Sequence, residues 1–382
     1  MPEIMNGSAA SLAEIRSLFP ITRECVYFNH AGTGPMSLPA RRAIERCIEV
    51  YSRNAEYAAD DYFRLIHRAR EKVAQLIDAL PEEIVLTHNT SEGIYIALAN
   101  LTWREGDVVL VMDEVFPAVR YVVDNNLPGV KKIYVPFSGR DPVEVVRKCA
   151  TEHVKAVVID HVQFLSGEVV DLVRLGDYTR SKGMVLVVDG IQSIGALAFD
   201  AQKASGVDFV ACGSAKWLFG PSGAGFLYIN RRNFRSLANL HTGWLGAAWI
   251  GWEDIDALPA LFPDARRFEM GTRNVIGILA LSENIDILLQ YGIERVEQRI
   301  AGVKLHLRRF FDAEGFTILA PVHGTQSGII TVQPKDRIRA LYRHLKEAGI
   351  VLSLRNEYLR FSPHFYNTEG EVDQIISAIR SF

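Results

Sequence analysis

The sequence is poor in cysteine and close to neutral in charge. Its four cysteines lie far apart, with neither a CxxC pair nor a neighbouring histidine at metal-ligand spacing. We therefore expect reduced, mostly buried thiols and no metal site. The formal net charge is -3 and no long basic run occurs. This argues against nucleic acid and against an anionic membrane surface as partners.

Long apolar runs are also missing. No window approaches the roughly 18 apolar residues that a membrane-spanning helix needs. The start of the chain, MPEIMNGSAASLAEIRSLFP, contains no basic segment followed by an apolar one, so a secretory signal is not predicted. Hydrophobic residues make up 48% and charged residues 23%, which is the balance of an ordinary globular protein. We expect a cytoplasmic protein, and the sequence contains no internal repeat.

From about Tyr27 to Ile229, short apolar runs alternate with segments of helical periodicity. Seven runs have the length and composition of strands: residues 83–87, 107–113, 131–137, 155–161, 184–190, 208–212 and 225–230. Runs that are apolar throughout indicate strands covered on both faces. The alternation of strand and helix predicts a mostly parallel sheet wrapped by helices.

The pattern changes near Arg266. A long helical region, ILALSENIDILLQYGIERVEQRIAGVKLHLRRFF, is followed by short strand-like runs and two more helical segments. We predict an α/β fold with a large domain over residues 26–260 and a smaller α+β domain over residues 261–382. Residues 1–25 contain one helical stretch, SLAEIRSLF, which is expected to pack on one of these domains.

Three polar features follow predicted strands, where the ligand site of an open α/β sheet is expected. HNTSEG, at residues 88–93, opens a helix and is either an anion site for phosphate or an ordinary N-cap. Asp189 ends the run MVLVVD, so its carboxylate either pairs with a cationic ring nitrogen or caps the next turn. Lys216 lies in the glycine-rich stretch VACGSAKWLFGPSGAGFLYI. It is nucleophilic in a dry pocket and unremarkable on a surface loop.

Together these features match what pyridoxal phosphate needs. A helix start can hold the phosphate, an aspartate can pair with the pyridinium nitrogen, and a lysine can form the Schiff base. Gln192, three residues after Asp189, either donates to a ring oxygen or lies on a solvated turn.

At this point the chain resembles a known family, the class V aminotransferases among the fold-type I pyridoxal-phosphate enzymes. This group includes cysteine desulfurases and isopenicillin N epimerase-like proteins. The resemblance covers nearly the whole chain and rests on YFNHAGTGPM, NTSEGI, HVQFLSG, VVDGIQSIGA, SAKWLFGPSGAGFLYI, FEMGTRN and LRFSPHFYNTEGEVD. It implies a fold-type I architecture, pyridoxal 5'-phosphate as cofactor, and a homodimer that shares its active sites.

The resemblance also implies roles for individual residues. Lys216 matches the Schiff-base lysine and Asp189 the partner of the pyridinium nitrogen, and these two are the catalytic candidates. Further cofactor contacts are implied for Gln192 near the phenolic oxygen, for Thr90, Ser91 and Ser214 at the phosphate, for Phe116 against the ring, and for Thr272 donated by the other subunit. Phe116 is equally interpretable as a core aromatic.

Substrate contacts are implied as well. Arg360 matches the arginine that grips the substrate carboxylate, a task that suits a planar guanidinium. Arg355 is a second candidate and His30 a third, although either arginine can instead form a surface salt bridge. The chain departs from the desulfurases because no cysteine follows Cys212. Among the histidines we prefer His161 for proton transfer, since it ends a predicted strand.

These expectations give a leading function and several alternatives. We predict a pyridoxal-phosphate enzyme acting on an amino acid or amine, most simply an aminotransferase. β-Elimination, as in carbon–sulfur cleavage, and epimerisation would use the same residues. A cofactor-binding protein without turnover is the alternative from another class. Trp244, Trp249 and Trp252 line either a substrate pocket or a subunit interface, and the sequence does not identify the substrate.

Overall fold

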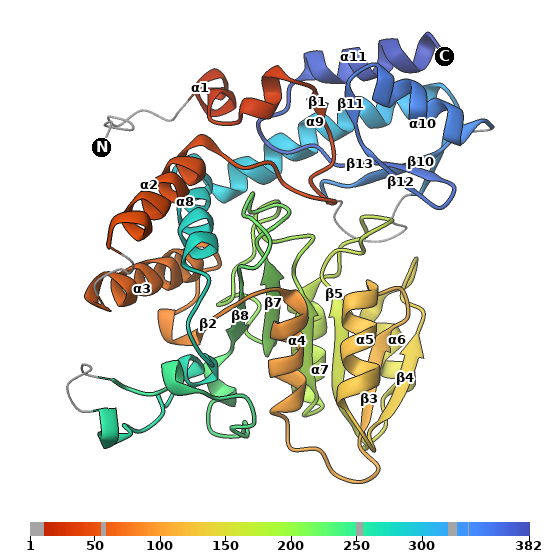
Figure 1. Ribbon diagram of the computed structural model, residues 1–382. Helices are drawn as coiled ribbons and strands as arrows, with labels where there is room; N and C mark the ends of the chain where they lie inside the picture. Colours follow the sequence, from red (N-terminus) through yellow and green to blue (C-terminus); the bar gives the residue numbers. More distant parts are fainter. Residues whose placement is uncertain (1–10, 55–58, 250–254, 320–326, 335) are drawn as a thin grey trace.

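A computed structural model describes residues 11–54, 59–249, 255–319, 327–334 and 336–382. Figure 1 shows a large sheet flanked by helices and, above it in this view, a smaller sheet with the C-terminal helix. The large sheet has seven strands in the order β2-β8-β7-β6-β5-β3-β4. Their bounds are β2 Ile84–Thr87, β3 Val108–Met112, β4 Lys131–Val135, β5 Val154–Asp160, β6 Val185–Asp189, β7 Phe209–Gly213 and β8 Gly225–Ile229. Each coincides with a run predicted as a strand.

The large sheet is parallel except at β8. β8 pairs antiparallel with β2 and β7, and the other neighbouring pairs are parallel. The central strands are rich in valine and isoleucine and almost fully buried, as expected where helices cover both faces. β4 is the more exposed edge strand. The predicted fold class, α/β with a mostly parallel sheet, is confirmed.

The strand order decides which helices cover which face. α4 (Thr90–Ala99) and α5 (Pro117–Asn126) lead to strands that lie further toward β4, whereas α6 (Pro142–Cys149) and α7 (Leu172–Ser181) lead the opposite way. Because crossovers between parallel strands are right-handed, the two pairs of helices cover opposite faces. Accordingly α4 packs against α5, and α6 against α7. This winding places the strand-to-helix loops at the carboxyl ends of the strands.

The smaller sheet is antiparallel, with its four strands in the order β12-β13-β10-β9. Its strands are β9 Thr317–Leu319, β10 Ile330–Gln333, β12 Ser353–Arg355 and β13 Tyr358–Phe361, and the helices of this region are α10 Ile338–Glu347 and α11 Glu369–Arg380. These elements enclose a second apolar cluster, which also includes Val26 and Phe28. The reason is that β1 (Val26–Tyr27) pairs with β11 (Ile350–Val351). The boundary predicted at residue 260 stays a prediction.

The long helical region of the sequence forms two helices. α8 (Val275–Tyr291) and α9 (Ile293–Ala313) meet at Gly292, with an angle of 82° between them. Gly292 has a φ of 92°, a conformation that glycine adopts without strain, so the chain can turn sharply there. α8 packs against α2 (Leu38–Asn54) and α3 (Ala59–Leu76).

The N-terminal segment is tied to both parts of the molecule. α1 (Leu12–Ser17) is followed by Phe19, whose ring lies 4.3 Å from the Tyr366 ring and 4.8 Å from the Phe219 ring. Arg16 pairs with Glu371 of α11 at 2.9 Å. This helix was predicted. The contacts of Arg16 and Phe19 place the N-terminal segment between α11 and the loop that carries Lys216 and Phe219.

All four cysteines are free thiols. Cys47 and Cys212 are buried, and Cys25 and Cys149 are half-buried. In the described part of the chain, no group of three or more His, Cys, Asp or Glu residues is arranged to hold a metal ion. No single helix within the described ranges is long and apolar enough to cross a membrane, although the bent pair α8 and α9 together reaches that length and composition.

Candidate active site

The carboxyl ends of three neighbouring strands bring polar residues together. β5 ends at Asp160, β6 at Asp189 and β7 at Gly213. Lys216 follows β7 directly, and the start of α4 lies beside it, because the Gly213 N–H donates a 3.0 Å hydrogen bond to the Thr90 hydroxyl oxygen. The helix start, the aspartate and the lysine that the sequence singled out therefore lie at one edge of the sheet.

The loop that carries Lys216 is fixed by hydrogen bonds on two sides. The Ser214 N–H donates to the Ala224 carbonyl at 2.9 Å, and the Gly34 N–H donates to the Ala215 carbonyl at 2.8 Å. A Cβ at Gly34 would lie 2.0 Å from the Lys216 carbonyl oxygen. Only glycine permits this approach, so the segment YFNHAGTGPM packs directly against the lysine-bearing loop.

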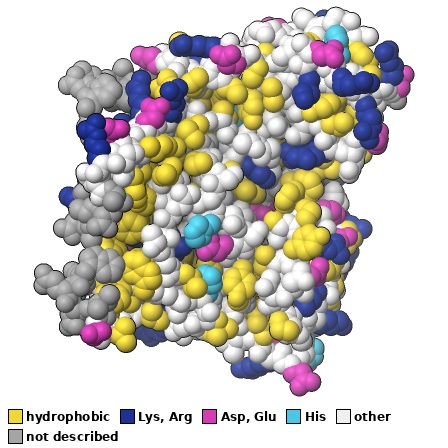
Figure 2. All heavy atoms as spheres, viewed as in Figure 1, with side chains coloured by type: hydrophobic (Ala, Val, Ile, Leu, Met, Phe, Trp, Pro, Cys, Tyr) yellow, Lys and Arg dark blue, Asp and Glu magenta, His cyan; other side chains and the backbone are white. Residues whose placement is uncertain are grey.

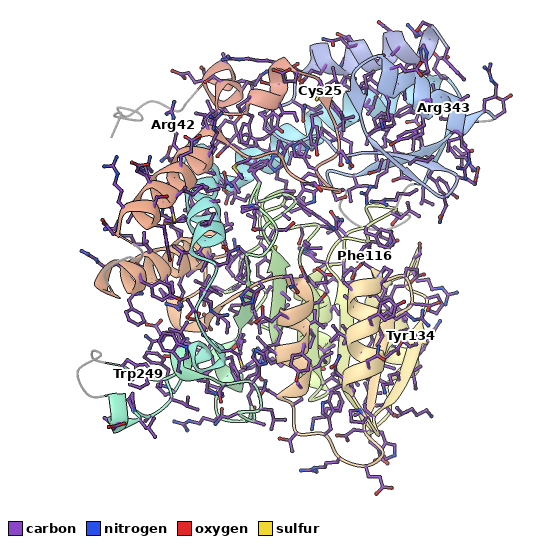
Figure 3. All side chains as sticks on the ribbon, in the orientation of Figure 1. Cys25, Arg42, Phe116, Tyr134, Trp249 and Arg343 are labelled. Atoms are coloured by element: carbon purple, nitrogen blue, oxygen red, sulfur yellow. The ribbon has the colours of Figure 1, made fainter. Side chains whose placement is uncertain are left out.

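Lys216 is half-buried and faces an aromatic ring. Its Nζ lies 5.4 Å from the centroid of the Phe116 ring. Burial lowers the pKa of Lys216 to about 8, and the charge of Asp189 opposes this shift. A sizeable neutral fraction near neutral pH is what a nucleophilic lysine requires. Figure 3 shows Phe116 at the end of α5 below the smaller sheet, and its ring is 40% exposed, which leaves area that a planar ligand can cover.

Asp189 is buried with few hydrogen bonds of its own. It is 3% exposed, and its Oδ1 accepts a 2.9 Å bond from the Ile191 N–H. Burial raises the pKa of this carboxyl, while the Ile191 N–H and the Lys216 charge act in the opposite direction. Asp189 therefore does cap the turn that follows β6, as one of the two interpretations predicted. A carboxylate has more acceptor sites than one N–H can fill, so capacity remains for a cationic ligand.

Gln192 is buried beside the lysine-bearing loop rather than on a solvated turn. Its Nε2 donates to the Ala31 carbonyl at 3.0 Å, and its Oε1 accepts from the Trp217 indole at 2.8 Å. One amide hydrogen remains for a ligand oxygen. The sequence analysis did not identify Trp217, whose indole N–H fixes which way the Gln192 amide points.

The start of α4, at HNTSEG, is an ordinary N-cap that still leaves backbone N–H groups for an anion. Asn89 is an N-cap, since its side chain accepts from the Glu92 N–H at 2.9 Å. This cap leaves the first N–H groups of the helix, those of Thr90 and Ser91, to other acceptors, and the helix start also favours negative charge. The Ser214 hydroxyl, predicted at the same phosphate, donates to the Pro221 carbonyl at 2.9 Å. Its oxygen alone is then left for a ligand donor.

The two candidate arginines differ sharply in environment. Arg360 in β13 is 1% exposed, and its Nη1 donates to the Phe164 carbonyl at 2.6 Å, but its buried Nε and Nη2 have no partner among the residues that the structure describes. Burial lowers the pKa of Arg360 to about 10, and its charge contributes to the lowered pKa of Lys216. Arg355 in β12 is exposed. Of the two, Arg360 is the one whose guanidinium lies buried and within electrostatic reach of the lysine.

His30 lies in a packed aromatic cluster. Its Nδ1 is 2.8 Å from the Ser362 carbonyl and its Nε2 is 2.6 Å from the Tyr366 hydroxyl. Its ring also contacts His364 and Trp217. Burial lowers the pKa of His30 to about 3. Both ring nitrogens are engaged within the protein, and its predicted contact with the substrate stays a prediction.

The remaining candidates differ in exposure. His161 is buried, its Nδ1 has no hydrogen-bond partner, and burial lowers its pKa to about 4. Thr272 is exposed. Trp244 is 37% exposed, and its carbonyl accepts from the Trp249 indole at 2.6 Å. Trp252 lies outside the described residues. The roles predicted for these side chains stay predictions.

Asp160 is a site residue that the sequence analysis missed. It ends β5 and pairs in register with Asp189 at the end of β6. It is 3% exposed, and its Oδ1 has no hydrogen-bond partner. A signal was available, because Asp160 directly follows the apolar run AVVI as Asp189 follows VLVV. A carboxyl group at the end of a covered strand is costly unless something compensates it.

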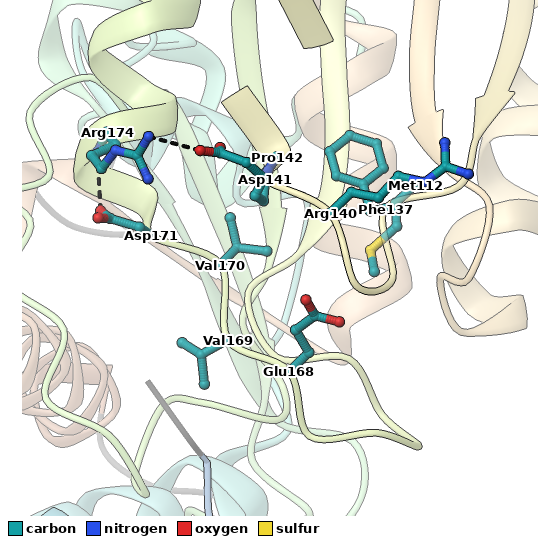
Figure 4. A pocket seen from close by; sticks show the side chains of 10 residues that line it. All are labelled: Met112, Phe137, Arg140, Asp141, Pro142, Glu168, Val169, Val170, Asp171 and Arg174. Carbon is teal, nitrogen blue, oxygen red and sulfur yellow. Dashed lines mark hydrogen bonds and ion pairs between the residues drawn. The ribbon is translucent and has the colours of Figure 1, made fainter. Parts of the chain in front are cut away.

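A cavity of about 330 Å³ lies at a different place on the large domain (Figure 4). Its lining includes Arg140, Asp141, Glu168 and Arg174. Arg174 pairs with Asp141 at 2.9 Å, and Glu168 accepts from the Gly139 N–H at 3.1 Å. None of the candidate residues lines this cavity. Because Asp141, Glu168 and Arg174 already have partners within the protein, we assign the chemistry to the strand ends instead.

Comparison with known proteins agrees with this geometry. The family model aminotransferase class-V matches residues 26–375. The uncharacterized aminotransferase YcbU of Bacillus subtilis is 25% identical, with 96% of each chain covered. A probable cysteine desulfurase of Methanothermobacter thermautotrophicus is 31% identical over 76% of this chain and 73% of its own.

A solved structure of the cystine C-S lyase C-DES, in complex with cysteine persulfide, has a TM-score of 0.87 at 23% identity. The match covers 95% of this chain and 99% of that chain, so the fold extends over the whole molecule. The fold-type I architecture expected from the resemblance is confirmed. Since the family model spans nearly the entire sequence, the chain belongs to the class V aminotransferase family.

Proposed function

We propose that this chain is a pyridoxal-phosphate enzyme that carries the cofactor on Lys216 and acts on an α-amino acid. The observation that carries the proposal is Arg360, a buried guanidinium with two unpartnered N–H groups near the lysine. A buried cation without a counter-ion is costly, so its site fits a carboxylate ligand. A substrate carboxylate on Arg360 would set the amino group of the same molecule toward Lys216.

The residues present fit the cofactor at each of its polar groups. Lys216 offers a half-buried amine with a lowered pKa, and Asp189 a buried carboxyl group for the ring nitrogen. The start of α4 at Thr90 offers N–H groups for the phosphate, and Phe116 offers a partly exposed ring for the cofactor ring. When bound, pyridoxal phosphate supplies the electron sink that weakens the bonds to the substrate α-carbon.

The protein side of the reaction follows from these positions. Arg360 holds the carboxylate and thereby orients the α-carbon. Lys216 takes the proton from that carbon and returns it, a task for which a pKa near 8 is suited because both protonation states are populated near neutral pH. Asp189 keeps a proton on the ring nitrogen. Asp189 and Arg360 are buried and Lys216 is half-buried, and this limited exposure to water strengthens their electrostatic effects.

We propose transamination as the reaction, because it would use the same residues: Lys216 would return the proton to the cofactor side instead of the substrate carbon, and one water would then hydrolyse the product and release the keto acid. The similarity to YcbU supports it, and the lack of any cysteine after Cys212 argues against persulfide-forming desulfuration. β-Elimination is the second candidate, favoured by the likeness of the whole fold to a C-S lyase.

The test is incubation of the holoenzyme with single L-amino acids, S-substituted cysteines included, without a keto-acid acceptor. Transamination predicts one keto acid released per site, with conversion of the cofactor to its pyridoxamine form, and then a stop. Continued release of pyruvate and ammonia would instead establish elimination. If no amino acid changes the visible spectrum of the bound cofactor, the proposal is wrong.

We also propose that two copies of the chain form a dimer in which each completes the site of the other. Several apolar side chains are exposed: Ile48 of α2, Leu240, Met270 and, at the start of α8, Ile276 are between 39% and 72% exposed. Figure 2 shows apolar groups down the left side of the molecule, where Figure 1 draws these helices. Thr272, predicted to reach the partner's phosphate, lies in the same stretch.

Hybrid dimers test this sharing. In a mixture of Lys216→Ala and Thr272→Ala chains, a hybrid has one site with both changes and one with neither. A shared site predicts that mixing restores activity above the mean of the two variants, and light scattering should give twice the mass of the chain. A monomer, or a mixture that stays at the mean, would contradict the proposal.

A further inference from the structure

Two carboxyl groups lie side by side at the end of the large sheet. Asp160 and Asp189 are the last residues of β5 and β6, and they are partners in the parallel register. Neighbouring strands are about 4.8 Å apart, and the side chains of paired residues point to the same face of the sheet. Both groups are 3% exposed and both feel the charge of Lys216.

The protein offers few donors for two anions at this place. Asp189 accepts the 2.9 Å bond from the Ile191 N–H. Asp160 accepts from the backbone N–H of Phe116, and within the described ranges its buried Oδ1 has no hydrogen-bond partner. A buried carboxylate normally has its acceptor sites filled. Two ionised carboxylates here would leave most of that capacity unused.

The charged groups that face Asp160 come from three different elements. Asp189 on β6 and Glu114 after β3 disfavour its anion, whereas Lys216 after β7 favours it. Burial, reinforced by the Asp189 charge, raises the pKa of Asp160 well above its usual range. Two adjacent carboxyl groups in a dry site titrate as a pair, and the second proton is hard to remove.

Two other titratable groups nearby do not change this balance. Cys212 on β7 faces Asp189, but burial raises the pKa of its thiol, which keeps the thiol neutral. Arg360 on β13 acts on Lys216, where it lowers the pKa. The pair of carboxyl groups therefore has one close ammonium group and too few donors for two full charges.

We propose that Asp160 and Asp189 together hold one proton in the cofactor-free protein and give it up when the cationic ring nitrogen of pyridoxal phosphate binds beside them. This inference rests on the function proposed above. In this step an O–H bond of the carboxyl pair breaks. The proton passes to a solvent water when the ring nitrogen arrives protonated, and to the lone pair of the ring nitrogen when it arrives unprotonated. No electrons are exchanged with another reactant, and the bound pyridinium replaces the proton as the positive charge beside the two carboxylates.

Proton stoichiometry tests the inference directly. Pyridoxal phosphate is added to the cofactor-free protein in weakly buffered solution near neutral pH, and protons taken up are measured for the wild type and for Asp160→Asn. In the wild type the carboxyl pair gives up its proton when the cofactor binds, whereas in the variant Asp189 is already ionised and has no proton to give up. We expect Asp160→Asn to take up about one proton more per bound cofactor than the wild type. Equal uptake by the two proteins would overturn the inference.

A matched variant separates this effect from general charge loss. Asp113 follows β3 at the same edge of the sheet, but its side chain is exposed and its carboxylate pairs with Arg120 at 3.2 Å. Asp113→Asn should take up as many protons as the wild type. If it shows the same increase as Asp160→Asn, the effect does not belong to the pair and the inference is wrong.

Infrared spectroscopy tests the same idea without any variant, in case Asp160→Asn does not fold. The cofactor-free wild type should show the carbonyl band of a protonated carboxylic acid, and pyridoxal phosphate should remove it. A deaza analogue, in which carbon replaces the ring nitrogen, should bind and leave the band in place. Loss of the band with both ligands, or its absence from the start, would refute the inference. Failure of the wild type to bind pyridoxal phosphate at all would refute the proposed function instead.

Discussion

Two buried aspartates at opposite ends of the same strands are satisfied very differently. Asp208 lies at the amino end of the sheet, where its carboxylate accepts from the Leu186 N–H at 2.8 Å and pairs with Arg232 at 2.8 Å. It accepts from the Asn233 side chain as well, at 2.9 Å. Asp189, at the carboxyl end, has the single bond from Ile191. Equal burial with unequal satisfaction indicates that the carboxyl end awaits a ligand.

The contrast does not rest on unpaired atoms alone. Arg70 and Arg273 also keep buried nitrogens without partners, yet both lie near Glu269, at 2.8 and 3.9 Å. Arg360, in contrast, forms no ion pair within the described part of the chain. An unpaired buried nitrogen indicates a ligand site when three further conditions are met: it is near the strand ends, its charge has no counter-ion, and a lysine close to it has a lowered pKa. Arg360 meets these conditions.

The largest expected effect comes from Lys216→Ala. Removing the amine abolishes covalent retention of the cofactor and the proton transfer at the α-carbon, so turnover should fall by on the order of 10⁴-fold or more. The comparison is Lys304, a second buried lysine, whose pKa burial lowers to about 7 but whose ammonium donates to the Ser327 carbonyl. Lys304→Ala should lower the unfolding temperature and retain the chemistry.

Borohydride reduction followed by peptide mapping decides between the two lysines. The label should be found on Lys216 in the wild type and in Lys304→Ala, and on no lysine in Lys216→Ala. A reduced, labelled Lys304 would place the chemistry away from the strand ends and would reverse the comparison.

The next test removes the negative charge of Asp189 and, separately, that of Asp208. Asp189→Asn should reduce turnover by roughly 10³-fold, because a neutral amide no longer keeps the ring nitrogen protonated. Its stability without cofactor should be unchanged or slightly raised, since an unsatisfied buried charge is lost. Asp208→Asn should do the opposite: it leaves Arg232 without its partner and should cost about 3 kcal/mol of unfolding free energy.

Denaturant unfolding of the cofactor-free proteins, with turnover measured on the folded fraction, separates these outcomes. The interpretation of the two strand ends would fail if Asp189→Asn were the less stable variant. It would also fail if the folded fraction of Asp208→Asn had lost its activity.

Much of the fold could be predicted because burial on both faces leaves a plain mark in the sequence. Most strands of the large sheet are apolar runs next to polar residues or glycine, so their places needed no tertiary information; β4, which begins with Lys131 and Lys132, is the clearest exception. The parts that were not predicted depend on distant partners. β1 and β11 are two residues each and exist only because they pair across the chain. The break at Gly292 was hidden because helical periodicity continues on both sides of it.

The site was predictable where a motif ties chemistry to a local position, as at Lys216 and Asp189. Asp160 was missed because its meaning depends on strand order: β5 and β6 had to be neighbours in register before the two carboxyl groups became a pair. Arg360 was predicted from its motif, but the sequence could not show that its Nε and Nη2 are buried without a partner among the described residues, because this depends on how β13 packs in the folded protein. Residue type is a local property, whereas hydrogen-bond satisfaction is a property of the packed structure.

The two arginines extend the comparison to the smaller sheet. Arg360→Ala should lower kcat/KM by about 10²-fold, mostly through KM, because a buried charge-assisted contact to the substrate carboxylate is lost. Arg355→Ala removes an exposed guanidinium and should stay within about threefold of the wild type. Steady-state kinetics should be run with an amino acid and with the corresponding amine, which lacks the carboxylate. If Arg360→Ala impairs both substrates equally, its role is structural and the carboxylate assignment is wrong.

The smallest effect is the pH dependence of cofactor loading. Lys216 attacks only as a neutral amine, and burial lowers its pKa to about 8. The rate of covalent loading should therefore rise about tenfold per pH unit below pH 8 and level off above it. Lys203 is the contrasting lysine, because Asp200 raises its pKa, so its labelling should still be rising where that of Lys216 is constant. Timed reduction with borohydride and mass spectrometry gives both profiles from the same samples. An inflection for Lys216 at the pH where an ordinary exposed lysine titrates would show that burial does not lower the pKa of Lys216. The electrostatic difference between the two ends of the sheet would then not explain the reactivity of this lysine.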